Sequence, residues 1–217
     1  MLTSNAEIKK SMTSIIKEQN ELKARVGDLE KRDKNSEAYV CALEQQVENV
    51  ERKLRETSIE INNLPTDNNG QMMTLIEQIH KTLQVQFDLG DTRSAYRLPA
   101  KPDQPRPIII EYTTLQKKIE LLQAYRKYNM NNKGERLNTS STGINGITKI
   151  IYIKEVLTKK GKHLHYLARD LIKNANWKFC WTVGGKVFIR KEEGQPAVEV
   201  KSDDQIASLY KEKPIED

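Results

Sequence analysis

The 217-residue sequence predicts an α+β protein in three parts, and three patterns indicate this. Apolar residues recur every seven positions over residues 1–56, short β-prone runs alternate with helical patterns over 57–148, and within the third part, 149–217, basic and aromatic residues are concentrated in 149–191. Hydrophobic residues make up 37% of the chain and aromatic residues 6%, which is low for one large core. We therefore expect part of the chain to be extended or weakly packed.

Residues 1–56 predict a coiled coil, because they contain no proline and their apolar positions fall on two tracks with a period of seven. The tracks are Ile8, Ile15, Leu22, Leu29, Ser36, Leu43 and Val50, and Met12, Gln19, Val26, Asp33, Val40, Val47 and Leu54. Eleven of these fourteen sites are apolar, and so narrow a stripe is buried only against other helices. The alternative is one helix on the chain's own globular part, which a helix of roughly 75 Å would overhang.

The segment Arg25–Glu30 favours a trimer. It carries the pattern R-h-x-x-h-E of short trimeric coiled coils, in which the arginine stem packs over the core and its head meets the glutamate of a neighbouring chain. The residues expected at the oligomer contact are Arg25, Val26, Leu29, Glu30, Leu43 and Val47. Asp33 and Ser36 interrupt the seam just after this segment, so we expect a looser helix contact there.

The order of elements over residues 57–148 predicts a ferredoxin-like fold. We expect strands over 58–64, 94–98 and 107–112, helices over 71–83 and 115–128, and a further strand after Lys133. The order βαββα is that of the fold to which RNA-recognition domains belong.

The predicted sheet offers few side chains for base stacking. In a standard RNA-recognition domain, aromatic residues on the two central strands stack on bases. Here Glu60 takes that place in the first strand, and the third strand offers Ile109 and Glu111, with Tyr112 near its end. If this unit binds nucleic acid, it does so through charged residues on its rim. The alternative for each of these residues is an ordinary solvent-exposed position without a binding role. These charges are Arg97, Lys101, Arg106, Arg126, Lys127, Lys133 and Arg136.

The strongest functional signal is the basic segment 149–191. Its net charge of +9 exceeds the +6 of the whole chain, and six aromatic residues lie among the cations. Cations neutralise phosphates, and flat rings stack on bases. The candidate nucleic-acid contacts in this segment are Lys154, Lys159, Lys160, Lys162, Arg169, Lys173, Lys178, Trp181, Lys186, Phe188, Arg190 and Lys191.

The same segment predicts a strand, a helix and a hairpin. A strand over 149–153 is followed by a basic helix that begins after Leu157–Thr158, its N-cap, and ends near Asn174. Gly184–Gly185 between two β-prone runs then predicts a two-residue turn. This turn sets the register of the hairpin, with Val183 opposite Lys186, Trp181 opposite Phe188 and Phe179 opposite Arg190.

The register divides the hairpin into two faces. One face carries Phe179, Trp181, Val183, Lys186, Phe188 and Arg190, and the other carries Cys180, Thr182, Val187 and Ile189. Either the aromatic and basic face is exposed and suited to nucleic acid, or its aromatic rings form the core while the cations reach water. The sequence leaves both arrangements open.

Three features of the C-terminal segment carry a resemblance: the strand followed by Lys154-Glu155-x-Leu157-Thr158, the basic helix with Ala168-Arg169, and the run WKFCWTxxGKVFIRK that ends at Lys191. With these features, residues 151–191 resemble the C-terminal domain of the baculovirus few-polyhedra (FP) protein family as it occurs in proteins of insect non-LTR retrotransposons.

A wider resemblance concerns the order of the three parts. A coiled coil, a recognition-fold unit and a basic unit also occur in this order in the first-open-reading-frame protein of LINE-type elements. Arg97 and the run Arg106–Tyr112 are similar to the arginine and strand of that family's recognition domain. This resemblance implies a trimeric, single-strand RNA-binding protein that acts as a nucleic-acid chaperone.

No pattern in the sequence predicts catalysis, a metal or a cofactor. His163 and His165 lie about 200° apart around a helix, so they form no dyad or ligand pair. Cys41 and Cys180 lack the spacing of a zinc site or a disulfide framework, and no GxSxG or Walker loop is present. No apolar run approaches the roughly 20 residues of a membrane span. We expect a non-enzymatic protein inside the cell, in a cytoplasmic ribonucleoprotein or the nucleus.

Two functions fit these expectations. The first is a homotrimer that binds RNA or single-stranded DNA through its basic unit. The second is a coiled-coil structural or assembly protein whose basic unit binds an acidic protein or a membrane-associated partner.

Overall fold

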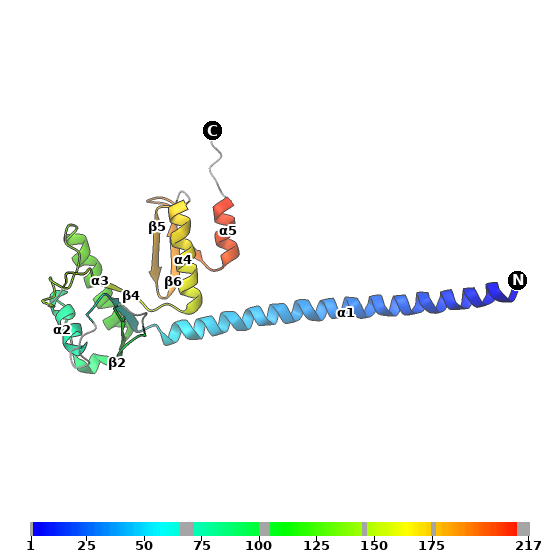
Figure 1. Cartoon of the computed structure of the whole chain (residues 1–217), viewed down its shortest axis with the longest axis horizontal. Helices are drawn as coiled ribbons and strands as arrows, with labels where there is room; N and C mark the ends of the chain where they lie inside the picture. Colours follow the sequence, from blue (N-terminus) through cyan, green and yellow to red (C-terminus); the bar gives the residue numbers. More distant parts are fainter. Residues whose placement is uncertain (1, 66–71, 100–104, 145–146, 175–176, 212–217) are drawn as a thin grey trace, which may run out of the picture. The chain divides into compact units, whose positions relative to one another are not determined.

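The computed structural model describes residues 2–65, 72–99, 105–144, 147–174 and 177–211, with side chains from Lys10 onward (Figure 1). The chain divides into two compact units, residues 1–49 and 50–217. The second unit holds two small sheets, each with its own core. The α+β class predicted from the sequence is therefore confirmed.

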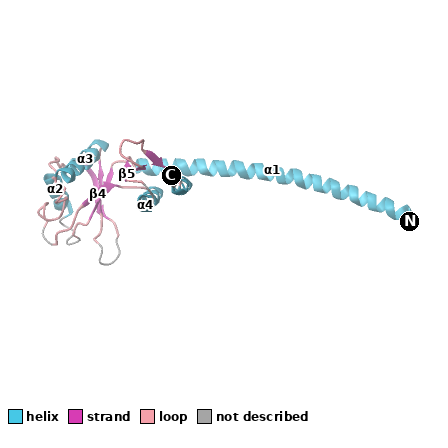
Figure 2. Cartoon of the chain, turned by 90° about the horizontal axis from the view of Figure 1, so that it is seen from above, coloured by secondary structure: helices cyan, strands magenta, loops and turns pink. Residues whose placement is uncertain are grey.

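Helix α1 runs from Leu2 to Leu54 without a break, as predicted for residues 1–56. Figures 1 and 2 both show it as one continuous helix. The apolar tracks are exposed within a single chain: Ile15 is 61% exposed, Leu29 62% and Val47 59%. The described residues of the chain therefore do not cover these three side chains.

A ferredoxin-like domain follows. Its elements are β1 (Ser58–Asn62), α2 (Met72–Thr82), a 3-10 turn η1 (Leu89–Asp91), β2 (Thr92–Arg97), β3 (Ile108–Tyr112), α3 (Leu115–Asn131) and β4 (Tyr152–Glu155). All paired strands are antiparallel, in the order β2-β3-β1-β4. This order and the sequence of elements define the ferredoxin-like topology.

The fourth strand differs from the sequence-based expectation. The strand expected over 149–153 as the start of the third part pairs instead with β1, where Ile153 lies opposite Ile61. In its described part, the segment after Lys133 adds only a bridge between Asn138 and Ile150. A local sequence pattern shows that a segment is β-prone but does not show which sheet it joins.

Helices α2 and α3 cover one face of this sheet (Figure 2). Side chains alternate along each strand, so Ile59 and Ile61 of β1 and Ile110 of β3 enter the core with Leu121 of α3. Each fully buried aliphatic side chain stabilises the fold by about 1.5–3 kcal/mol. Tyr112, at the end of β3, is 2% exposed and belongs to this core.

The C-terminal domain contains the predicted basic helix and hairpin. Its elements are α4 (Lys159–Asn174), β5 (Phe179–Val183), β6 (Lys186–Arg190), β7 (Val198–Val200) and α5 (Asp203–Lys211), with the strand order β5-β6-β7. The hairpin register is the predicted one, with Trp181 opposite Phe188. Gly184 and Gly185 have φ angles of 59° and 72°, as a type I′ turn requires.

The core of this domain decides which hairpin face is exposed. Val187 is 2% exposed and Ile189 0%, and both pack with Leu164, Ala168 and Leu171 of α4. The opposite face, which carries Trp181 and Phe188, is therefore directed away from α4. Of the two arrangements that the sequence left open, the structure has the one with the aromatic and basic face outward.

Candidate nucleic-acid interface

The outward face of the hairpin holds an ordered set of rings. The ring centres of Trp181 and Phe188 lie 5.9 Å apart with planes 19° from parallel, and the Arg190 guanidinium carbon lies 5.2 Å from the Trp181 ring centre. Cross-strand pairing brings these three side chains together, because Trp181 faces Phe188 and Arg190 is two residues further along β6. Phe179 extends the surface and is 41% exposed. The face therefore offers flat apolar surface beside a fixed cation.

Two cations at this face have acidic neighbours that the sequence did not reveal. The Nζ atom of Lys186 lies 3.2 Å from Glu199 of β7, and Lys178 lies 3.4 Å from Glu192. The Lys178–Glu192 pair is largely exposed and the Lys186–Glu199 pair is partly exposed, so both contribute little to stability and are weakened by salt. Neither Arg190 nor Lys191 takes part in any ion pair found within the described ranges, and both are partly buried.

Helix α4 presents a basic stripe on the side away from its core. Thr158 caps the helix as predicted, since its Oγ1 accepts a hydrogen bond of 2.9 Å from Gly161 N. The exposed side chains of the stripe are Lys162, Tyr166, Arg169 and Lys173, spaced by four, three and four residues on one face. Lys159 and Lys160 are exposed in the first turn. The stripe therefore interleaves one aromatic ring with cations.

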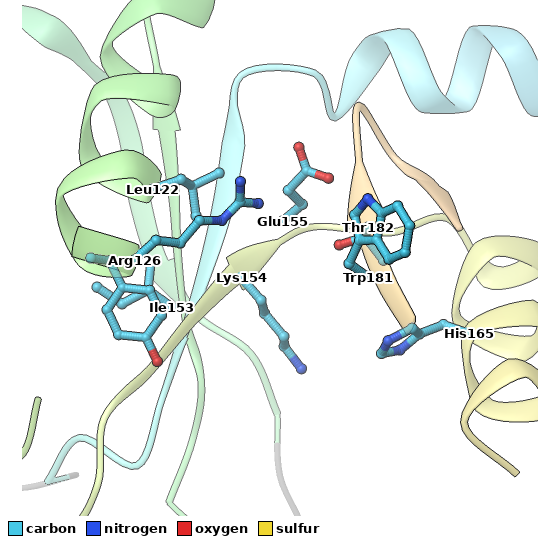
Figure 3. A pocket seen from close by; sticks show the side chains of 9 residues that line it. Leu122, Arg126, Ile153, Lys154, Glu155, His165, Trp181 and Thr182 are labelled. Carbon is cyan, nitrogen blue, oxygen red and sulfur yellow. The ribbon is translucent and has the colours of Figure 1, made fainter. Parts of the chain in front are cut away.

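A crevice of about 400 Å³ lies between the two domains of the second unit (Figure 3). Its lining residues are Leu122, Tyr125, Arg126, Ile153, Lys154, Glu155, His165, Trp181 and Thr182. The strands that line it, β4 and β5, are the edge strands of their two sheets. Figure 3 shows Arg126 on one side, Trp181 and His165 on the other and Lys154 between them. A cationic crevice thus continues from the outward face of the hairpin.

The ionisable groups that line the crevice include two cations, Lys154 and Arg126, the hydrogen-bonded acid Glu155 and the histidine His165. Burial lowers the pKa of His165, and the neighbouring charges of Arg169 and Lys154 lower it further, so the ring is neutral at pH 7. The Nζ atom of Lys154 lies 3.0 Å from Glu60 Oε1 and remains half exposed. Arg126, on the surface of α3, adds a second cation at the opposite wall.

The open face of the ferredoxin-like sheet carries two tyrosines that the sequence did not assign to it, although Tyr152 is one of the six aromatic residues of the basic segment. Tyr96 of β2 is 44% exposed and Tyr152 of β4 is 45% exposed. Both are on the side of Glu60, because Tyr96 pairs with Ile109, which pairs with Glu60, and Tyr152 pairs with the next outward residue of β1. The two central strands lack aromatic side chains on this face, as expected, but the edge strands do not. Alternation within the expected strands, combined with their order, would have found them.

The rim arginines Arg97 and Arg106 donate hydrogen bonds to backbone carbonyls, and Arg106 remains exposed to solvent. The guanidinium of Arg97 donates to the carbonyls of Arg106 and Pro65, and Arg106 Nε donates to Leu98 O at 3.2 Å. Burial, and then the charge of Arg106, lower the pKa of Arg97. Strand β2 is also at the opposite edge of the sheet from the crevice. These two residues hold loops together far from the hairpin surface.

The other rim charges are divided between two places. Lys133 and Arg136 are exposed in the segment after α3, where Leu137 O accepts a hydrogen bond from Ile151 N just before β4. Arg126 lies at the crevice and Lys127 is exposed beside it on α3. Lys101 is outside the described residues.

These features define a class of chain: a long helix with an exposed seven-residue apolar repeat, then a ferredoxin-like domain and a basic hairpin domain. Residues 158–210 match the family model of Baculovirus FP protein domain 2. The match begins at the cap of α4 and ends in α5, so it includes β7 and most of α5, which the sequence analysis did not predict. It supports the resemblance to the FP family for this domain. No curated protein is significantly similar to the chain.

The side chains that could serve catalysis or bind a metal are scattered. Within the described ranges, no three His, Cys, Asp or Glu residues are grouped so that they could hold a metal ion. Burial raises the pKa of the Cys180 thiol to about 11, which makes it a poor nucleophile. None of the described helices has the length and apolar character needed to cross a membrane.

Proposed function

We propose that the protein binds single-stranded nucleic acid, RNA in the first instance, through the outward face of its C-terminal hairpin and the stripe on α4. The observation that carries this proposal is the orientation of the hairpin. Its small apolar residues pack on α4, while Trp181 and Phe188 stack on the other face with Arg190 above the indole. Rings with an adjacent cation bind bases and phosphates of any sequence.

The shape of the surface favours a single strand over a duplex. Bases in a duplex are stacked on one another, so side-chain rings reach them only where the strand is unpaired. The crevice beside Trp181 has room for single nucleotides and adds Lys154 and Arg126 at its walls. A strand that crosses the hairpin and enters the crevice would contact cations of both domains.

The exposed seam of α1 supports a homotrimer as the working form. Three chains joined by one helical bundle bring three basic domains together, which raises the avidity for a long strand. The order of the three parts supports the same proposal through its resemblance to LINE-type first-open-reading-frame proteins. On this proposal the protein coats the RNA of a LINE-type element to form a ribonucleoprotein. It acts there as a nucleic-acid chaperone, without catalysis of its own.

The family match favours a second candidate. The matched domain is named for a baculovirus FP protein, and the same basic surface could bind an acidic protein in a coiled-coil assembly. This role requires charge complementarity but no stacking of rings on bases.

A titration of the full-length chain separates the two candidates. Labelled single-stranded RNA, single-stranded DNA and duplex RNA of equal length are titrated at two salt concentrations, and binding is followed by fluorescence anisotropy. We expect tighter binding to both single strands than to the duplex, with affinity that falls as salt rises. Weak binding of equal affinity to both single strands and the duplex, which disappears as salt rises, would favour the assembly role.

A further inference from the structure

The turn of the basic hairpin is held by a carboxylate from the ferredoxin-like domain. Glu155, the last residue of β4, accepts hydrogen bonds from the two consecutive glycines of the turn, at 3.1 Å from Gly184 N to Oε1 and 3.2 Å from Gly185 N to Oε2. Both glycines have positive φ, so their N–H groups point to the same side and form a small anion-binding nest. The bound anion is a side chain of the chain itself.

The same carboxylate is bound from its other side by a buried lysine. The Nζ atom of Lys118 lies 3.1 Å from Glu155 Oε1 and donates at 2.8 Å to the carbonyl of Glu56. Lys118 is 2% exposed and Glu155 is 9% exposed, so water replaces neither partner easily. The ion pair therefore connects helix α3, the end of β4, Glu56 in the segment between α1 and β1, and the hairpin turn.

The turn fits closely into this junction. A Cβ atom added to Gly185 would lie 2.7 Å from Cγ of Arg52, and one added to Gly161 of α4 would lie 3.6 Å from the Gly185 carbonyl. There is no room for a side chain at Gly185 without movement of its neighbours. The turn therefore contacts Arg52 of α1 and Gly161 of α4, and the hydrogen bonds to Glu155 connect it to the ferredoxin-like domain.

The charge of Glu155 is unexpected at this place. It is one of only two acids among residues 149–191, which carry eleven Lys and Arg. An exposed acid beside the crevice would repel phosphates, but both oxygens of Glu155 are engaged by donors of the chain. Glu155 therefore acts on binding by holding the hairpin in place. Strand β5 lines the crevice, and the turn that follows β5 is fixed by the Glu155 carboxylate.

We infer that Glu155 is a positioning residue for the nucleic-acid surface. It fixes the hairpin against the edge of the ferredoxin-like sheet, so that a preformed groove runs from Trp181 into the crevice and one strand contacts both domains. This inference rests on the proposed function. A preformed groove avoids the cost of ordering the hairpin on binding, and this advantage is confined to strands long enough to reach both domains.

The test compares two strand lengths in full-length Glu155→Gln. Gln keeps the size of Glu but loses the charge and one acceptor. A strand of about four nucleotides covers the hairpin alone, and one of about twelve reaches both domains. We expect Glu155→Gln to weaken binding of the long strand about tenfold and of the short strand less than twofold. Glu77→Gln, which removes an exposed acid on α2, outside both the junction and the hairpin face, should leave both affinities within twofold.

A second variant distinguishes a loss of positioning from a loss of folding. The double variant Lys118→Met with Glu155→Gln removes the ion pair without leaving a buried charge unpaired, so it keeps the fold but not the carboxylate on the turn. It should show the same selective loss for the long strand. Hydrogen exchange of the segment around Gly184 and Gly185 should be faster in both variants than in the wild-type protein, with the melting temperature of the double variant close to that of the wild type.

The outcomes separate this inference from the function on which it rests. If the wild-type protein binds and Glu155→Gln loses affinity equally for both lengths, or for neither, the residue does not position the groove and the inference is wrong. If the wild-type protein binds neither strand, the proposed function fails and the inference fails with it.

Discussion

The guanidinium carbon of Arg190 lies 5.2 Å from the centre of the Trp181 ring, on the face of the hairpin that points away from the domain core. Neither residue is needed there to fill the core, which Val187 and Ile189 supply from the other face. A cation over an indole restricts both side chains and keeps the ring at the surface. Such an arrangement suits contact with a base and its phosphate.

The seam of α1 is tested by a charge at its centre. Leu29→Asp places a carboxylate among the apolar side chains of the proposed trimer, where burial of an unpaired charge is strongly unfavourable. We expect the full chain to sediment as a monomer, whereas the wild type sediments as a trimer. Ala24→Asp, which adds the same charge on the side away from the seam, should stay trimeric. A wild-type monomer at micromolar concentration would contradict the coiled coil.

The same variant tests the role of the trimer in binding. If three basic domains act on one strand, monomeric Leu29→Asp should bind a long single strand about 100-fold more weakly than the wild type. Binding of a strand of a few nucleotides, which reaches one domain, should be almost unchanged. Equal affinities of the two proteins for the long strand would show that the domains act separately.

Salt dependence distinguishes surface cations from structural ones. Arg169 is exposed on the α4 stripe, so Arg169→Gln should reduce the slope of log affinity against log salt by about one. Arg97 binds backbone carbonyls, so Arg97→Gln should leave this slope unchanged and lower the free energy of unfolding by about 1–3 kcal/mol. Titrations at four salt concentrations and urea unfolding measure both quantities. A reduced slope for Arg97→Gln together with an unchanged slope for Arg169→Gln would instead place the nucleic-acid interface at β2.

Protonation of His80 should destabilise the ferredoxin-like domain in acid. The ring is 2% exposed, with Nδ1 2.8 Å from Ile76 O and Nε2 2.9 Å from the Tyr112 hydroxyl. Burial lowers the pKa of His80, and the charge of Lys117 acts in the same direction, against the opposing effects of the Ile76 hydrogen bond and Glu120.

The sign follows from the lowered pKa. Above pH 6.5 the ring is neutral in both the folded and the unfolded chain, and stability does not depend on its titration. As pH falls below 6.5, the unfolded chain binds a proton that the folded chain does not, so stability decreases until the folded pKa is reached. The melting temperature of the wild type should fall in this window, and that of His80→Gln should fall less. Parallel curves for the two proteins would assign the acid sensitivity to other groups.

Several elements could be predicted from the sequence because their signals are local. The seven-residue repeat predicts α1, and Gly184–Gly185 predicts the turn and with it the pairing of Trp181 with Phe188. The strand at 149–153 was also recognised, but its partner β1 is about ninety residues earlier, and no local pattern reveals such a pairing. The strand expected to begin the third part therefore belongs to the ferredoxin-like domain.

The rest of the candidate site depends on contacts between distant segments. Glu199 pairs with Lys186 only because β7 joins the hairpin, and β7 is three residues long within an acidic segment. The position of Glu155 under the turn follows from the docking of two domains. Tyr96 and Tyr152 share a face only through the order of four strands. The charge and aromatic content of the sequence indicated where the surface lies. Which of its residues are directed outward depends on the fold.

Stacking of bases on the outward face of the hairpin is tested most directly by Trp181→Ala. Affinity for single-stranded RNA and melting temperature are measured together, with Trp177→Ala as the control because Trp177 packs against the domain core. We expect Trp181→Ala to lose about 1–3 kcal/mol of binding free energy at every salt concentration with little change in melting temperature, and Trp177→Ala to lower the melting temperature with little change in affinity. A large fall in melting temperature for Trp181→Ala with unchanged affinity of the folded protein would contradict stacking by this face.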